Sequence, residues 1–144
     1  MPTRDDTQEP ARAATVLLID DDRAVRSFLR ACLEDADYAV CDAVDVDSAL
    51  TVLDERRVDA VVLDVRMPDP RGLGRSGLEV LEFIRLRAAS GSLPVLILTG
   101  HPLDRREQEI IDRHRADVFL KPDGYRKLLQ RLAELTGRRG IERR

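Results

Sequence analysis

Short apolar runs alternate along the chain with segments whose apolar residues recur at helical spacing. The first run, residues 15–20, reads TVLLID. The segment after it carries five apolar residues at regular intervals, Val25, Phe28, Leu29, Cys32 and Leu33. These positions follow the pattern i, i+3, i+4, i+7 and i+8, which places them on one face of a helix. The pattern predicts a strand at 15–20 followed by an amphipathic helix.

The same alternation continues to residue 135. Further strands are predicted at 38–43, 58–64, 94–99 and 117–120. Further helices are predicted around residues 49–53, over 77–89, around 110–111 and over 125–135. The run VDAVVLD at 58–64 is apolar at nearly every position, as is typical of a strand buried on both faces. Five strands alternating with five helices predict an α/β fold, a doubly wound parallel sheet with helices on both faces and right-handed crossovers.

The length of 144 residues suits one domain with a single core. Residues 1–14 are polar and contain two prolines, so they are expected to form a disordered N-terminal tail. Residues 137–144, GRRGIERR, are expected to form a basic C-terminal tail. The domain itself is therefore predicted to span residues 15–136.

Charge and hydropathy exclude several classes of function. The 24 basic and 27 acidic residues are mixed along the chain and give a net charge of −3, so direct binding of nucleic acid is not expected. No apolar run is long enough to span a membrane, and the first residues lack a signal peptide's apolar segment. A cytoplasmic protein without membrane contact is expected. Cys32 and Cys41 lack metal-site spacing and are interpreted as small apolar residues.

Polar residues gather where the predicted strands end. They are Asp20, Asp21 and Asp22 after the first strand, Asp64 after the third, Thr99 ending the fourth and Lys121 after the fifth. In doubly wound sheets the ligand site lies at the carboxyl ends of the strands. Taken singly, Asp22 is expected to cap the following helix, while Thr99 could be a turn residue and Lys121 an exposed charge. Their arrival together at one edge favours a functional site.

The chemistry of this edge favours a metal-bound phosphoryl group. Two carboxylates about 4 Å apart repel by roughly 4 kcal/mol at an effective dielectric near 20, so a cluster of them needs a counter-charge. Hard oxygen ligands from few residues suit Mg²⁺ better than Zn²⁺. Asp64 can then act as the nucleophile, while Lys121 and Thr99 contact the phosphoryl oxygens.

With these motifs the chain resembles the receiver domains of two-component response regulators. The motifs that carry the resemblance are LLIDDD (17–22), VVLDVRMP (61–68), GLEVL (77–81), PVLILTG (94–100) and LKP (120–122). The resemblance covers residue 15 to about residue 136. It implies a flavodoxin-like sheet with the strand order 2-1-3-4-5.

The resemblance also implies a role for each site residue. Asp64 would be the phosphoacceptor, and Asp21, Asp64 and the backbone carbonyl of Arg66 would bind Mg²⁺, with Asp20 assisting largely through water. Lys121 and Thr99 would contact the phosphoryl group. Gly100 would leave that group open to a partner or water, and the bond between Lys121 and Pro122 would be cis. The phosphoryl donor would be a sensor histidine kinase or a histidine phosphotransfer protein.

Two features depart from the family pattern. Residues 69–76, DPRGLGRS, form a longer loop than the family usually has. This loop is either a tolerated insertion or a contact for the kinase or the output partner. The position three before Lys121, where the family usually has an aromatic residue, holds Val118, and strand alternation turns the neighbouring Phe119 to the other face.

The main hypothesis is a signalling switch without an output domain of its own, which acts through a downstream protein partner and catalyses only its own phosphorylation and dephosphorylation. One alternative is a small phosphatase similar to the haloacid dehalogenase group, with Asp20 as nucleophile and Asp22 completing a DxD motif. That motif calls for another residue where Ala24 stands. A second alternative is a non-phosphorylated binding module on the same fold. The sequence leaves open whether the chain forms a homodimer.

Overall fold

The structure, a computed structural model, describes residues 13–67, 76–87, 91–121 and 124–137. The strands of these residues are β1 (Thr15–Ile19), β2 (Ala39–Ala43), β3 (Ala60–Leu63), β4 (Val95–Thr99) and β5 (Asp117–Leu120). The helices are α1 (Arg23–Asp35), α2 (Val46–Glu55), α3 (Gly77–Leu86), α4 (Arg105–Arg113) and α5 (Tyr125–Thr136). The strands pair in parallel in the order β2-β1-β3-β4-β5, which confirms the predicted α/β fold and strand order.

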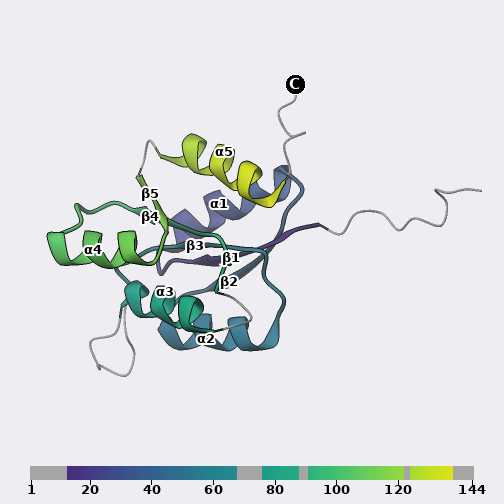
Figure 1. The fold of residues 1–144 in the computed structure, drawn as a ribbon. Helices are drawn as coiled ribbons and strands as arrows, with labels where there is room; N and C mark the ends of the chain where they lie inside the picture. The colour runs from purple at the N-terminus through teal and green to yellow at the C-terminus, as the bar shows by residue number, and fades with distance from the viewer. Residues whose placement is uncertain (1–12, 68–75, 88–90, 122–123, 138–144) are drawn as a thin grey trace, which may run out of the picture.

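Alternating side chains of the central strands divide the core into two clusters. On β1, Val16 and Leu18 contact the cluster that includes α1 and α5, while Leu17 and Ile19 contact the cluster that includes α2, α3 and α4. Figure 1 shows α1 and α5 on one side of the sheet and α2 and α3 on the other. Because β1, β3 and β4 are covered on both faces, they carry the apolar runs that the sequence shows.

Side-chain caps start the helices close to the ends of the strands. Asp22 accepts hydrogen bonds from the backbone N–H groups of Ala24 and Val25, so its predicted role as the cap of α1 is confirmed. α4 begins with a capping box in which Asp104 and Glu107 each accept a hydrogen bond from the other's backbone N–H. These caps place α1 and α4 directly beside the carboxyl edge of the sheet.

The predicted elements differ from the structure mainly at their ends. α3 ends at Leu86, before the predicted end at residue 89, because the backbone of Arg87 is already extended. The predicted tails lie almost wholly outside the described residues, so the domain bounds stay a prediction. None of the described helices has the length and apolar character needed to cross a lipid bilayer.

Candidate functional site

The carboxyl ends of four neighbouring strands bring the predicted site residues together. Asp20 and Asp64 directly follow β1 and β3, and the backbone N–H of Asp64 donates to the carbonyl of Ile19 over 2.9 Å. Thr99 is the last residue of β4, and its carbonyl accepts a 2.9 Å hydrogen bond from the backbone N–H of Lys121, which follows β5. The sheet's own hydrogen bonds therefore hold the backbones of these residues in place.

Three carboxylates lie close enough to share one cation. Asp20, Asp21 and Asp64 each offer an oxygen, and these oxygens lie within 4.8 Å of one another. Asp20 and Asp64 are buried, whereas Asp21 is exposed. A set of hard oxygen donors that is open on one side fits Mg²⁺, which keeps water or phosphate oxygens among its ligands. The donor set thus fits the metal that the sequence predicts.

Asp20 is held by two hydrogen bonds at the base of this cluster. Its Oδ1 accepts from the backbone N–H of Asp22 over 2.9 Å, and its Oδ2 accepts from Nζ of Lys121 over 3.0 Å. Burial is the largest effect on the carboxyl group and raises its pKa; repulsion from Asp64 adds to this, and the two hydrogen bonds offset it only in part. A cation near Asp20 would relieve this electrostatic cost.

The Lys121 ammonium group lies between two carboxylates but nearer to Asp20. Nζ is 3.7 Å from Oδ2 of Asp64, beyond hydrogen-bond distance, compared with 3.0 Å to Asp20. Burial lowers the pKa of Lys121, but the hydrogen bond to Asp20 and the charges of Asp20 and Asp64 outweigh burial and raise it overall. Lys121 is therefore a fixed positive charge beside Asp64, and it leaves Oδ2 of Asp64 free of a direct hydrogen bond from that ammonium group.

A hydroxyl and a glycine complete the edge at the end of β4. The Thr99 side chain is fully buried, and its Oγ1 accepts a hydrogen bond from the backbone N–H of His101 over 3.3 Å. Gly100 is exposed, and a Cβ built there would contact only the Lys121 side chain, at 3.6 Å and more. The surface above Lys121 is therefore open at this position.

Asp64 is also held from the loop that follows β3. The backbone N–H of Arg66 donates to Oδ1 of Asp64 over 3.0 Å. Gly77, the first residue of α3, approaches so closely that a Cβ there would lie 2.3 Å from the carbonyl oxygen of Asp64. Only glycine fits at this contact, so α3 packs directly against the backbone of the proposed phosphoacceptor.

Sequence reasoning assigned Arg66 only a backbone role and missed the contacts of its side chain. The guanidinium forms a two-pronged ion pair with Glu107, which the sequence reasoning did not include in the site. The D-x-x-E spacing of Asp104 and Glu107 is a sequence signal for a capping box and could have identified α4's first turn. Nothing in that spacing indicates Arg66 as a further partner.

On β5, the packing shows which face of the sheet Val118 and Phe119 occupy. Val118 packs against the cluster that includes α4, and Phe119 packs against the cluster that includes α1 and α5. The predicted turn of Phe119 to the other face is therefore correct. Of the long loop at 69–76, all but Ser76 lies outside the described residues, as does Pro122 of the predicted cis bond.

Comparison with known proteins identifies relatives over nearly all of the described chain. The family model of the response regulator receiver domain matches residues 16–133. Response regulator MprA of Mycobacterium sp. (strain KMS) is 38% identical over 123 residues, which make up 85% of this chain and 50% of that protein. MprA of Mycobacterium ulcerans (strain Agy99) is 37% identical over 127 residues, 88% of this chain and 52% of that protein. The chain spans about half the length of the curated relatives it matches.

Solved structures with the same fold include receiver proteins from several bacteria. The chemotaxis response regulator CheY4 of Vibrio cholerae matches with a TM-score of 0.74 and 27% identity, over 86% of this chain and 99% of that chain. The receiver domain of sensor histidine kinase PA1611 from Pseudomonas aeruginosa PAO1 matches with a TM-score of 0.73 and 23% identity, over 88% and 99% of the two chains. That structure has a magnesium ion coordinated in its active site cleft, and at this identity the likeness supports the fold alone.

Proposed function

Since this chain belongs to the response regulator receiver domain family, we propose that it is a signalling switch that accepts a phosphoryl group on Asp64. The observation that carries the proposal is the cluster at the carboxyl edge of the sheet. Three carboxylates lie together there, and the positively charged ammonium group of Lys121 lies beside two of them. A nucleophilic carboxylate, a metal-binding set of oxygens and a cation for phosphoryl oxygens are the groups that phosphoryl transfer needs.

Asp64 is the proposed nucleophile because its Oδ2 accepts no hydrogen bond from the nearby ammonium group. This oxygen attacks the phosphorus of a phosphohistidine, so that a P–O bond forms while the P–N bond breaks. The imidazole nitrogen of the donor leaves with the electron pair of the broken bond. The Lys121 ammonium group neutralises charge on the phosphoryl oxygens, and the Thr99 hydroxyl orients them by a hydrogen bond. The backbone N–H of Arg66 fixes the direction of the Asp64 carboxylate.

The proposed cofactor is Mg²⁺, held by Asp21, Asp64 and the backbone carbonyl of Arg66, with Asp20 acting largely through water. When bound, the metal neutralises the carboxylates and the transferred phosphoryl group. The three clustered oxygens support this assignment. The magnesium ion in the receiver domain of PA1611 supports it at the level of a protein with the same fold.

The proposed donors are a sensor histidine kinase or a histidine phosphotransfer protein, and the proposed output is contact with a downstream protein. The net charge of −3, with basic and acidic residues mixed, supports a protein rather than a nucleic acid or a membrane as the direct partner. Two free thiols, Cys32 and Cys41, support a reducing compartment, and the cytoplasm is the proposed location.

Incubation with acetyl phosphate and Mg²⁺, followed by mass spectrometry of the intact protein, tests the proposal. We expect the wild-type chain to gain one phosphoryl group and Asp64→Asn to gain none, because the amide is not a nucleophile. The matched control is Asp59→Asn, which changes a carboxylate that is hydrogen-bonded by the backbone N–H of Thr15. We expect this control to be labelled like the wild type.

Labelling of Asp64→Asn at the wild-type rate would refute the assignment of the nucleophile. If the label then disappeared only in Asp20→Asn, the phosphatase alternative would replace the proposal. A wild-type chain that gained no phosphoryl group with either acetyl phosphate or a phosphohistidine donor would favour a non-phosphorylated binding module.

A further inference from the structure

The side chain of Arg66 connects the loop after β3 to the first turn of α4. Its NH1 lies 2.9 Å from Oε2 of Glu107 and its NH2 lies 3.1 Å from Oε1, so the pair is two-pronged. The same NH2 donates to the carbonyl of Pro102 over 3.1 Å. A two-pronged contact between guanidinium and carboxylate fixes orientation as well as distance. Arg66 therefore holds both the loop before α4 and the helix itself.

The position of Glu107 is well fixed, because its side chain is buried and forms part of the capping box at the start of α4. Only 8% of its surface is exposed. Oε1 also accepts a 2.9 Å hydrogen bond from the backbone N–H of Asp104, and the backbone N–H of Glu107 donates to Oδ1 of Asp104 over 2.8 Å. A shift of the Arg66 guanidinium must therefore either break the ion pair or move the first turn of α4 with it.

The other end of Arg66 touches the phosphoacceptor. Its backbone N–H donates to Oδ1 of Asp64, two residues earlier in the chain. Among the described residues, no other hydrogen bond or ion pair joins the Val65–Met67 loop to the segment from Gly100 to Arg113. On β5, Val118 packs against the apolar cluster that includes Ile110 and Ile111 of α4. Its side chain has no polar atom that could form a hydrogen bond to α4.

We propose that Arg66 and Glu107 form the link through which the state of Asp64 is reported at α4. This inference rests on the proposed phosphorylation of Asp64. When Oδ2 of Asp64 carries a phosphoryl group, Oδ1, which accepts the Arg66 N–H, becomes a carbonyl oxygen and loses much of its negative charge. The added group brings about −1.5 to −2 units of charge beside it. The N–H of Arg66 must then change its hydrogen bond, and the rigid contact with Glu107 carries that change to α4's first turn.

Backbone amide NMR with and without beryllofluoride, a phosphoryl mimic, and Mg²⁺ tests the link. In the wild type we expect shift changes both at residues 64–66 and at residues 104–108. In Glu107→Gln the changes at 64–66 should persist, while those at 104–108 should fall below about half of the wild-type size. Glutamine keeps the oxygen that completes the capping box, so α4 should still form.

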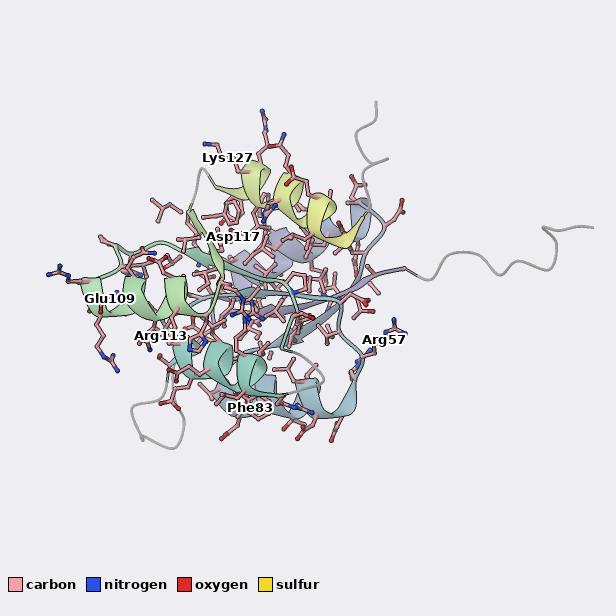
Figure 2. The ribbon with its side chains drawn as sticks, viewed as in Figure 1. Arg57, Phe83, Glu109, Arg113, Asp117 and Lys127 are labelled. Carbon is pink, nitrogen blue, oxygen red and sulfur yellow. The ribbon has the colours of Figure 1, made fainter. Side chains whose placement is uncertain are left out.

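A second variant and a matched control keep the test specific. Arg66→Lys keeps the charge but loses the two-pronged contact, so it should also weaken the response of α4. In the control, Glu109→Gln, an exposed carboxylate of the same helix loses its charge (Figure 2). The ion-pair partner of Glu109 is Arg105 of α4, at 3.7 Å, and not Arg66. We expect this variant to respond like the wild type. Combining Arg66→Lys with Glu107→Gln should add little to either change alone, since both break one link.

Two outcomes would overturn the inference in different ways. A full response of residues 104–108 in folded Glu107→Gln and Arg66→Lys would show that α4 receives the signal by another route. Absence of any shift at residues 64–66 in the wild type would refute the proposed function itself, and the inference would fall with it. If Glu109→Gln lost the response as strongly as Glu107→Gln, the effect would be one of α4's general charge.

Discussion

The charged side chains at the two ends of the sheet differ in how they are paired. At the amino end, Asp59 accepts a 2.7 Å hydrogen bond from the backbone N–H of Thr15, and Asp117 pairs with Arg131 at 2.9 Å. The Arg85 guanidinium donates to backbone carbonyls such as those of Leu93 and His114. Each of these charged side chains forms a hydrogen bond with another group of the chain. The chain's own groups therefore supply hydrogen bonds to these side chains, while burial and the nearby Arg115 lower the pKa of Arg85.

At the carboxyl end, negative charge exceeds what the described residues neutralise. Asp20, Asp21 and Asp64 share one edge with the single ammonium group of Lys121. Like charges held together in a partly buried site cost stability unless an ion joins them. The comparison shows that the charges named at the amino end are paired within the chain, whereas the carboxyl end holds an excess of negative charge that a bound cation would offset.

The largest expected effect concerns how tightly each end is packed. Gly77→Ala would place a Cβ 2.3 Å from the carbonyl oxygen of Asp64, whereas Gly91→Ala, before β4, would meet no atom closer than 3.4 Å. We expect Gly77→Ala to lower the free energy of unfolding by about 1–3 kcal/mol, the usual cost of overpacking. Urea unfolding of both variants measures the difference. Equal stabilities would mean that the start of α3 can move away from Asp64 freely.

The next effect sharpens the difference in charge between the two ends. Mg²⁺ at ten times its dissociation constant should stabilise the native protein by about 1.4 kcal/mol, because it binds only the folded site. The gain should shrink in Asp21→Asn and stay unchanged in Asp59→Asn, whose side chain lies at the amino end. Thermal unfolding with and without Mg²⁺ measures it. Equal metal-induced shifts in Asp21→Asn and wild type would remove Asp21 from the site.

Much of this arrangement could be predicted because parallel strands bring their ends together. The meeting of Asp20, Asp64, Thr99 and Lys121 follows from strand alternation with helices. The placement of Phe119 on the face opposite Val118 follows from the period of two. Both depend on local pattern, which a single sequence displays.

Contacts that depend on the path of loops could not be predicted in the same way. Arg66 and Glu107 are 41 residues apart, and their pairing requires knowledge of how the loop before α4 runs. The approach of Gly77 to Asp64 likewise arises from packing between two elements rather than from local pattern. The sequence shows a glycine there but not the carbonyl oxygen that excludes a side chain.

The smallest expected effect is a change of stability with pH at the carboxyl end in metal-free buffer. Burial raises the pKa of Asp20 above its ordinary value of 3.8, so between these two pKa values the folded protein binds more protons than the unfolded chain. Stability therefore falls as the pH rises through that window, since the ionised carboxylate is disfavoured in the folded state. Asn at this position has no proton to lose, and its oxygen can still accept a hydrogen bond. We therefore expect Asp20→Asn to gain stability relative to wild type as the pH rises from about 4 to 7.

Lys121 keeps this effect small because its hydrogen bond and its charge lower the pKa of Asp20 and so offset part of the effect of burial. Its own ionisation does not change in the range of the measurement. Its raised pKa means that its favourable contribution is complete below 10.5 and is lost only as the pH rises through the folded value, so it stays constant up to pH 7. Urea unfolding at several pH values in the presence of a chelator measures the difference between the two proteins. Saturating Mg²⁺ is the control and should reverse the order, because wild type then gains a bound cation that Asp20→Asn holds less well. If the stability advantage of Asp20→Asn over wild type shrank with rising pH in the absence of metal, the folded protein would stabilise the Asp20 carboxylate. The charges at the carboxyl end would then be paired within the chain, as they are at the amino end.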